Sequence, residues 1–537
     1  MALLDQLDEA IDSASRYVAS RMTASGRFIG GCEARPLETA LFLHLENVLG
    51  EDASTAPRLA AYCRRFLDEP TGVSGGIDAI LSTLICRRVL GDGLSQADHA
   101  ALTAGLARFD HPTHRRKRLF FNVILAELGA VAPPELVFPA AAARQPNNQL
   151  WVSVILTSLR ILLAGLHDRV DAISRDEIAF IVDNQGADGG WEQHVLATIV
   201  ALIALRRAGY RGPALRRGID YVRRQLRDDG GIPFIADEDV WVTCLSGYVL
   251  AGARPSTCDL NRVARYVAGL QAENGGWAYS EGVRQTDADD TCVALAFLSR
   301  HDAVGHREAI RRAQWYLIAL QNEDGGFPTF VRGAPSEAEI TAKAIIAMRS
   351  SSAAAFAGRI RRAWRWLATA QREDGSFRAE WKLCATYPTL HVLSAAALFE
   401  GDAAAERVRS RTLEFLRRWR RPDGGWGLRE SGGELHLLST AYALAGLAMD
   451  RDGLDRIEFS RSLALLLEMQ GSDGGFHGSG DSLGPRPFVY DVPLLASVYS
   501  LLALSYSRAA LLRHIQRSVD ERDRATPQRA WRMVGGL

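Results

Sequence analysis

The chain has 537 residues, of which 47% are hydrophobic, and its 63 basic side chains balance 63 acidic ones. This length and apolar content predict at least two domains with large cores and exclude a disordered chain. The lack of net charge argues against a nucleic-acid binder. Residues 1–18 carry acids where a secretion signal would have a basic end, and no window of about 18 residues is apolar and uncharged. We therefore expect a cytoplasmic protein.

Two residue types are unusual in their spacing or number. The seven cysteines form no C-x-x-C pair and no zinc-type spacing with a histidine, so we interpret them as free buried thiols. Only three lysines occur, Lys117, Lys343 and Lys382, against sixty arginines. Each of these lysines is therefore worth locating in the fold.

In chain order, residues 1–180 show helical periodicity without clear repeats, and a fixed repeat then begins. Each complete copy has a glutamine, an acidic or amide residue, one or two glycines and an aromatic ring. From Gln271 onward the copies lie 49 or 50 residues apart. The complete copies are 185–191, 271–277, 321–327, 371–377 and 470–476, and the degenerate copies are 228–232 and 420–426.

Each repeat unit predicts a helix, a turn and a second helix. Before Gln321, Trp315 and Ile318 fall on one helical face, and glycine then ends the helix because it adopts left-handed geometry without steric cost. Stacked helix pairs close into a ring when their curvature allows it. We predict an all-α fold of two (α/α) barrels. Residues 1–20 are assigned to a segment that joins the second barrel, 21–254 to the first barrel and 255–537 to the second.

Three aspartates, Asp287, Asp289 and Asp290, stand apart from the repeats at a predicted helix start. One acid would suffice to cap a helix and to favour its dipole. Three crowded carboxyls are costly to ionise together, so at least one should keep its proton near neutral pH. In a dry cavity, such an acid could protonate a very weak base, for example an alkene.

The Q-x-x-D/E-G-G/S-W/F repeats and the D-x-D-D-T sequence at 287–291 together resemble the class II terpene cyclases, which include squalene–hopene cyclases and bacterial copalyl diphosphate synthases. The resemblance covers about residues 180–505. It implies two α-barrels, called β and γ, with the active site between them. It also implies that Asp289 is the general acid that protonates a terminal alkene, while Asp287 and Asp290 hold its geometry and protonation state.

Two of the three lysines stand where that family has histidines. Lys343 occupies a position on the helix after the next repeat, where the family usually places a histidine near the acid. Lys382 replaces the first histidine of a segment that keeps Trp381, Tyr387 and His391. The resemblance implies that these residues lie at the substrate cavity. The alternative is that both lysines are ordinary solvated side chains.

Lys343 is predicted to lie close to Asp289. An ammonium beside a carboxyl favours the ionised carboxylate, which by itself would spoil a proton donor. Two arrangements avoid this outcome. Glu339, one helical turn earlier, would neutralise Lys343, or Lys343 would pair with Asp287 or Asp290 and leave Asp289 protonated.

Carbocation chemistry needs walls that stabilise positive charge without reacting with it. Aromatic faces supply roughly 0.5–2 kcal/mol per contact. The candidate wall residues are Trp241, Trp277, Tyr279, Trp381, Tyr387, Tyr442, Phe488 and Tyr490.

A diphosphate group on the substrate would need Mg²⁺ or basic side chains. Asp237, Glu238 and Asp239 are the candidate Mg²⁺ ligands, with a solvated acidic turn as the alternative. The basic run 115–118 could also meet a diphosphate, although a solvated surface is its simpler interpretation.

These features predict an isomerase, a class II diterpene cyclase that converts geranylgeranyl diphosphate to a bicyclic diphosphate and retains the diphosphate group. The alternative is a drimane-type cyclase of farnesyl diphosphate, or a cyclase of an isoprenoid without diphosphate. A protein prenyltransferase β subunit would need a zinc site of Asp, Cys and His, which the sequence does not indicate. A helical binding scaffold would leave the three aspartates unexplained. A homodimer is left open.

Overall fold

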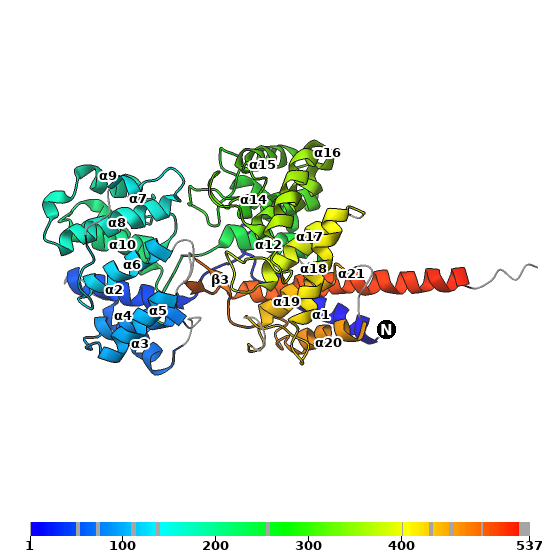
Figure 1. The fold of residues 1–537 in the computed structure, drawn as a ribbon, viewed down its shortest axis with the longest axis horizontal. Coiled ribbons are helices and arrows are strands. Elements are labelled where there is room, and N and C mark those ends of the chain that lie inside the picture. The colour runs from blue at the N-terminus through cyan, green and yellow to red at the C-terminus, as the bar shows by residue number, and fades with distance from the viewer. Residues whose placement is uncertain are drawn as a thin grey trace, which may run out of the picture.

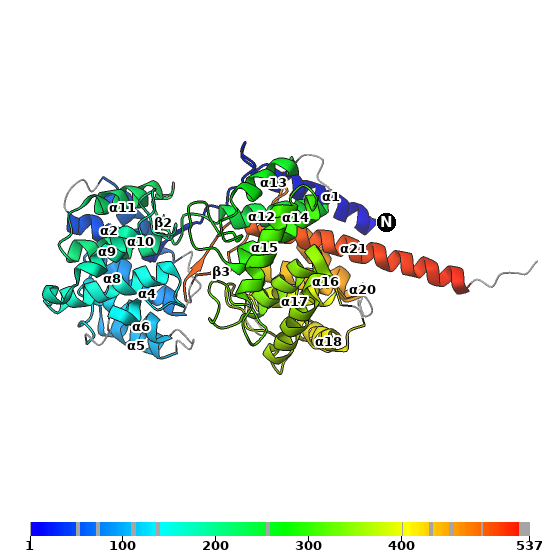
Figure 2. The same ribbon diagram turned by 90° about the horizontal axis from the view of Figure 1, so that it is seen from above.

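The computed structural model consists of two helical lobes that lie side by side (Figures 1 and 2). It describes residues 2–49, 54–70, 76–108, 114–135, 140–253, 258–399, 401–428, 433–450, 456–484 and 487–525. Within these residues, strand is limited to four segments of two residues each. The predicted all-α class is therefore confirmed.

The first barrel forms the lobe at the blue and cyan end of the chain (Figure 1). Its elements are β1 (Ala34–Arg35), α2 (Pro36–Leu49), α3 (Ala56–Asp68), α4 (Gly76–Val89), α5 (Gln96–Arg108), α6 (His114–Glu127), α7 (Ala140–Ala143), α8 (Leu150–Leu166), the 3₁₀ helix η1 (Val170–Ala172), α9 (Arg175–Asp183), α10 (Val195–Arg207), α11 (Pro213–Arg224) and β2 (Ile232–Pro233). The two strands are antiparallel, with Ala34 opposite Pro233 and Arg35 opposite Ile232. Residues 195–205 of α10 are buried on all sides, so α10 is an inner helix, whereas α11 buries one face and packs outside it.

The second barrel follows the same plan. Its elements are α1 (Ala2–Ala19), α12 (Asp239–Ala253), α13 (Leu260–Gly269), α14 (Ala288–Asp302), α15 (Arg307–Leu320), α16 (Ala338–Ala370), α17 (Thr386–Ala396), α18 (Ala403–Arg418), α19 (Leu437–Leu447), α20 (Arg456–Glu468), β3 (Ser482–Leu483), β4 (Val489–Tyr490) and α21 (Leu494–Ala525). Strands β3 and β4 pair antiparallel, with Ser482 opposite Tyr490. By length and composition, residues Leu494–Arg517 of α21 could cross a membrane, but 72% of that window is buried inside the protein, as in a core helix.

The border between the barrels differs from the predicted one. The predicted boundary between residues 254 and 255 lies outside the described residues, but α12, which ends just before it, packs against α13, α14 and α21. Helix α12 therefore belongs to the second barrel, and the first barrel ends earlier than the sequence suggested. Helix α1 packs against α21 and α12. The chain thus starts in the second lobe, builds the first and then returns.

The repeats join each outer helix to the next outer helix. In the copy at 321–327, Gln321 Nε2 donates to the carbonyl oxygens of Gly325 (2.8 Å) and Arg359 (3.1 Å). Gly325 has φ +95°, which glycine adopts readily. The last copy makes the same pair of bonds, from Gln470 to Gly474 (2.9 Å) and to Ala10 of α1 (3.0 Å). The glutamines therefore act as structural ties.

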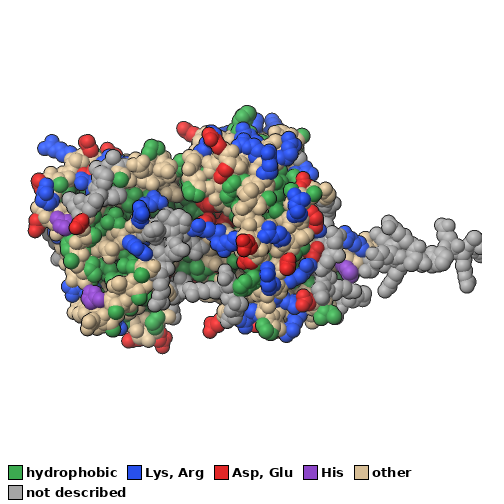
Figure 3. All heavy atoms as spheres, viewed as in Figure 1, with side chains coloured by type: hydrophobic (Ala, Val, Ile, Leu, Met, Phe, Trp, Pro, Cys, Tyr) green, Lys and Arg blue, Asp and Glu red, His purple; other side chains and the backbone are tan. Residues whose placement is uncertain are grey.

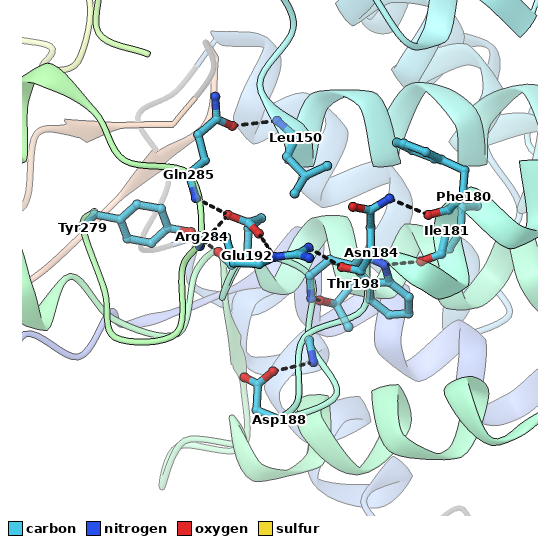
Figure 4. A network of polar contacts seen from close by, with 12 residues as sticks. Leu150, Phe180, Ile181, Asn184, Asp188, Glu192, Thr198, Tyr279, Arg284 and Gln285 are labelled. Carbon is cyan, nitrogen blue, oxygen red and sulfur yellow. Dashed lines mark hydrogen bonds and ion pairs between the residues drawn. The ribbon is translucent and has the colours of Figure 1, made fainter. Parts of the chain in front are cut away.

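Glu192 of the first barrel holds the loop that precedes α14 (Figure 4). Its carboxylate accepts hydrogen bonds from Arg284 Nε (3.0 Å) and from the backbone amides of Arg284 (3.1 Å) and Gln285 (3.0 Å). The side-chain oxygen of Gln285 accepts in turn from the amide of Leu150 at 2.7 Å. Asp287 follows only two residues later, so these bonds fix the start of α14 relative to the first barrel.

Candidate active site

A narrow cavity of about 90 Å³, which we call the acid cavity, lies between the two barrels. Its walls come from both barrels: Trp151, His194, Phe234, Ile235, Glu238, Trp241, Tyr279, Asp287, Asp289, Asp290, Thr329, Phe330, Trp381, Lys382, Tyr387, Gly484 and Tyr490. Figure 3 shows the molecule hollowed between the lobes, with apolar side chains on the first-barrel side. All three aspartates of the predicted motif thus reach one cavity.

The aspartates occupy the first turn of α14. Asp287 caps the helix, because its Oδ1 accepts from the amide of Asp290 at 2.8 Å. Burial raises the pKa of Asp287 to about 7, and the charge of Asp289 adds to this effect. Burial also raises the pKa of Asp290 well above its usual range, with Asp287 as the next cause, and Asp290 Oδ1 has no hydrogen-bond partner among the described residues. These two carboxyls therefore retain protons near neutral pH.

Lys343 of α16 lies beside Asp289, as the sequence predicted. Its Nζ is 2.6 Å from Asp289 Oδ1 and donates to the Tyr387 hydroxyl at 2.5 Å. The ammonium also lies 4.9 Å from the Tyr387 ring centroid and 5.8 Å from that of Trp241. Among the described residues Lys343 makes no ion pair with Asp287, Asp290 or Glu339. Burial raises the pKa of Glu339 to about 7, against the opposing effects of a 2.9 Å hydrogen bond from the backbone amide of Trp381 and of the charge of Lys343. The lysine pairs with Asp289 itself.

The second buried lysine, Lys382, reaches the acid cavity from the segment before α17. Its Nζ donates to Ser482 Oγ at 2.6 Å and lies 3.8 Å from Asp481, a carboxylate that is fully buried. It is 5.1 Å from the ring centroid of Trp241. The alternative of two solvated surface lysines is therefore wrong, because Lys343 is only 5% exposed and Lys382 only 3%.

A larger cavity of about 590 Å³ adjoins the acid cavity, and we call it the basic cavity. The two share Trp151, His194, Phe234, Trp381 and Gly484. Arg116, Lys117 and Arg378 line only the basic cavity. Burial, together with the charge of Arg116, lowers the pKa of Lys117 to about 7. Part of the basic run 115–118 therefore faces a cavity.

His194 stands at the junction of the two cavities and was not anticipated from the sequence. It is the N-cap of α10, because its Nδ1 accepts from the amide of Ala197 at 3.4 Å. Burial, aided by Lys117, lowers the pKa of His194 to about 3, so the ring is neutral. With Nδ1 accepting, the proton lies on Nε2, which is buried and has no partner among the described residues. His194 therefore offers one neutral hydrogen-bond donor to a ligand.

Both halves of the chain match known domains. Residues 333–509 match the squalene-hopene cyclase C-terminal domain, and residues 135–378 match the prenyltransferase alpha-alpha toroid domain. The chain is 34% identical over 509 residues to drimenyl diphosphate synthase of Streptomyces showdoensis, covering 92% of this chain and 93% of that protein. It is 33% identical over 516 residues to drimenyl diphosphate synthase of Streptantibioticus cattleyicolor, covering 92% and 94%. The chain belongs to the class II terpene cyclases.

A solved structure shares the fold of this class II cyclase. It is ent-copalyl diphosphate synthase from Streptomyces platensis, with a TM-score of 0.65 over 94% of this chain and 99% of that one. At 19% identity, this likeness concerns the fold alone. The resemblance inferred from the repeats and the aspartates is thus confirmed at the level of the family.

The predicted aromatic wall of the cyclase is partly assembled. Trp241, Tyr279, Trp381, Tyr387 and Tyr490 line the acid cavity, and Phe488 lines the basic cavity. Trp277 is fully buried in the second barrel, where its indole N–H donates to the carbonyl of Val267 at 2.7 Å. Tyr442 lies behind Tyr387, with ring centroids 5.1 Å apart, and His391 faces a different cavity. Trp277 is a repeat residue, whereas Tyr442 and His391 were chosen from the family resemblance, and neither observation shows which side a residue faces.

The acidic triplet 237–239 does not converge on one point. Glu238 faces the acid cavity. Asp239 pairs with Arg27 at 2.8 Å, and Asp237 accepts from Ser280 Oγ at 2.5 Å. Within the described residues, no group of three acidic, histidine or cysteine side chains could hold a metal ion. The triplet thus does not fit the predicted Mg²⁺ site, because Asp237 lies in a β-bridge to Gly31, only Asp239 is helical, and the three side chains have different partners.

Proposed function

We propose that this class II cyclase converts farnesyl diphosphate to a drimane-type bicyclic diphosphate by protonation and keeps the diphosphate group. The observation that carries the proposal is a proton-bearing acid cavity that adjoins a basic cavity across His194. Two relatives at 33–34% identity, both drimenyl diphosphate synthases, favour the C15 substrate over the C20 substrate. The alternative considered from the sequence therefore replaces the first choice.

At the acid end, the terminal alkene of the substrate would contact Asp289, whose side chain is 15% exposed. The alkene takes the proton, so an O–H bond breaks and a C–H bond forms. Internal alkenes then close two rings. Asp287 and Asp290 hold Asp289 at the first turn of α14, and their retained protons limit the negative charge around it. Removal of a proton beside the final cation completes an isomerisation.

The walls would protect the cation along its path. Trp241, Tyr387 and Trp381 present aromatic faces, which stabilise positive charge by about 0.5–2 kcal/mol each. The apolar side chains Phe234 and Phe330 exclude water, which would otherwise quench the cation. The same exclusion strengthens each electrostatic contact in the cavity.

At the other end, the diphosphate would lie in the basic cavity. Arg116 and Lys117 supply positive charge, Arg378 pairs with Glu380 of the same cavity at 2.7 Å, and His194 Nε2–H supplies a donor at the junction. His194 begins α10, so the positive end of that helix dipole also faces the junction. In a drimane the diphosphate is close to the second ring. A donor that borders both cavities suits that short distance.

Mg²⁺ stays a prediction, and we propose that it enters bound to the substrate diphosphate. The triplet 237–239 does not fit a metal, so no step depends on a resident ion. When bound, Mg²⁺ would neutralise part of the diphosphate charge. Geranylgeranyl diphosphate remains a second candidate, because the basic cavity of about 590 Å³ leaves room for a longer chain.

Incubation with the C15, C20 and C30 isoprenoids, with and without Mg²⁺, tests the proposal. We expect a bicyclic C15 diphosphate, found as its alcohol after phosphatase treatment. Preferred turnover of the C20 diphosphate would establish the second candidate instead. Absence of any cyclised diphosphate would refute the proposed function.

A further inference from the structure

A third cavity lies behind the acid motif, inside the second barrel, and we call it the rear cavity. Its volume is about 410 Å³, which exceeds that of the acid cavity. Cys292, Val293, Ala296 and Arg300 of α14 line it, together with residues of α12, α16, α17 and α21 and with Met449. The first turn of α14, in contrast, faces the acid cavity. Helix α14 therefore borders both cavities.

Lys343 forms the contact between these two cavities. It lines the rear cavity, whereas its Nζ donates to Asp289 and Tyr387, which line the acid cavity. A second contact joins the cavities, because the hydroxyl of Tyr499, a rear-cavity residue, donates to Tyr387 at 3.4 Å. The acid thus has a continuous polar connection to the side away from the substrate.

The chemistry of the rear cavity suits water. Two of its lining residues, His391 and Ser505, each have a buried polar atom without a hydrogen-bond partner among the described residues. Buried polar atoms are nearly always hydrogen-bonded, and a cavity of this size has room for water beside its polar side chains, although most of its lining is apolar. The acid cavity, by comparison, is narrow and would be filled by an apolar substrate during the reaction.

We propose that Lys343 resupplies the proton of Asp289 from water in the rear cavity, an inference that rests on the proposed function. After the alkene has taken a proton, Asp289 is a carboxylate. One N–H bond of Lys343 breaks and an O–H bond forms on Asp289. The neutral amine then takes a proton that rear-cavity water relays from solvent, so that no hydroxide is left in the cavity. The proton lost by the final cation returns to solvent, so each turnover balances.

The same contact explains how a lysine can stand beside a proton donor. Water leaves the acid cavity when an apolar substrate enters, and a charged pair loses stability relative to a neutral pair as its surroundings become dry. A proton can cross the 2.6 Å contact directly. The carboxylic acid and the amine are then both neutral, with the acid ready to donate.

Three substitutions of Lys343 separate this relay from a purely electrostatic role. Lys343→Arg keeps the cation but cannot release a proton, because a guanidinium is always protonated in proteins. Lys343→His restores a group that can carry a proton. Lys343→Met removes both the cation and the relay. In this variant Asp289 is protonated before the substrate is added, and after each turnover it regains a proton only slowly, through the acid cavity. Thermal unfolding of each variant checks the fold.

Rapid-quench kinetics with excess farnesyl diphosphate measure the first turnover and the steady state separately. We expect Lys343→Met to form about one product per enzyme at the parent rate and then to slow at least about tenfold. Lys343→Arg should be slow in both phases, and Lys343→His should exceed both in the steady state. The inference is wrong if the steady-state rate of Lys343→Arg equals that of the parent. It is also wrong if Lys343→Met slows the first turnover by the same factor as the steady state.

A pair of variants at Ala296 tests the rear cavity without touching Lys343. Ala296→Phe fills the space beside α14, whereas Ala296→Ser keeps it open. The inference predicts a slower steady state with an unchanged first turnover for the phenylalanine variant only. Equal steady-state rates for the two variants would contradict it. An unaltered protein that turns over no prenyl diphosphate would instead refute the proposed function, and the inference with it.

Discussion

Helix α14 of the second barrel and helix α10 of the first both begin at the acid cavity. The residue before each helix caps it, but the two capping residues differ in their chemistry. Asp287 caps α14 by accepting from the amide three residues later, at 2.8 Å, and His194 caps α10 in the same way, at 3.4 Å. The aspartate brings a cluster of carboxyls that keep their protons. The histidine brings a neutral ring with one free N–H donor.

The difference shows how one helix-pair architecture supplies both ends of a reaction. Both caps satisfy orphan amide groups, so either residue type serves the fold. The function of each side chain depends on the polar atoms that do not take part in the cap. Under the proposed function, the second barrel offers a proton and the first barrel offers a binding site for the diphosphate. The following predictions test this division, from the largest expected effect to the smallest.

Asp289→Asn should abolish protonation of the substrate in the acid cavity. The amide has no acidic proton, so we expect the rate of cyclisation to fall by at least about 10³-fold. The fold should persist, because Asp289 is not the helix cap. Product analysis beside a thermal unfolding curve checks both statements. A folded variant with near-normal turnover would end the protonation mechanism.

Asp287→Asn and Asp290→Asn should each lower the rate by roughly 10–100-fold. An asparagine still caps α14, so the helix start stays in place. Each change replaces an ionisable carboxyl by a neutral amide. This removes the electrostatic interaction between that carboxyl and Asp289. The pKa of Asp287 is about 7, so parent activity should also fall as the pH rises above 7 and this carboxyl ionises. An unchanged pH–rate profile in Asp287→Asn would show that Asp287 does not cause that fall.

His194→Asn should affect binding more than chemistry. Asparagine is a good N-cap but is too short to offer the donor that His194 Nε2 offers. A hydrogen bond to a charged group contributes about 1.5–3 kcal/mol, so KM for the diphosphate should rise about tenfold or more with kcat little changed. His436→Asn is the matched control, because His436 caps α19 in the same manner, at 3.2 Å. Equal KM values for the two variants would show that His194 does not bind the diphosphate.

Lys117→Gln tests the cationic end through its pH dependence. The pKa of Lys117 is lowered to about 7, so its ammonium is present below that pH and is lost above it. In the parent, KM for the diphosphate should rise about three- to tenfold between pH 6.5 and 8.5. The variant should have a high KM with a smaller rise over the same range. A parent KM independent of pH would show that Lys117 does not meet the diphosphate.

Gln321→Ala should leave the chemistry of both barrels unchanged and lower stability only. The variant loses the hydrogen bond to Gly325 within the turn and the two bonds shared with Arg359 of the next helix, at a cost of about 1–3 kcal/mol. Glu323→Ala, an exposed change in the same turn, should cost less than about 0.5 kcal/mol. Denaturant unfolding compares the two. Equal stability would mean that the glutamine ties do not hold the barrel.

The sequence predicted those features that depend on local spacing. The glutamine and glycine of each repeat define a turn that lies within seven residues, so the helix pairs could be located. The aspartates could be assigned to one helix start for the same reason. The position of Lys343 close to Asp289 was predicted from the family resemblance, because spacing along the chain does not connect two helices.

Other features depend on how distant segments meet, and local spacing does not encode them. The basic cavity combines Lys117 of α6 with Arg378 of the second barrel, 261 residues later in the chain. His194 resembles any other helix cap until the second barrel closes over it. The triplet 237–239 gave a false metal site, because a run of acids does not reveal that their side chains turn apart.

The bond from Gln470 to Ala10 joins residues 460 positions apart. Helix α1 therefore contributes to a barrel whose remaining helices are synthesised only after the whole first barrel. During translation, α1 emerges with its amphipathic face uncovered and must wait for α12 and α21. The first barrel can fold on the ribosome as soon as its own residues have emerged. Closure of the second barrel is thus the late, long-range step of folding, and the active site between the barrels forms no earlier than that step.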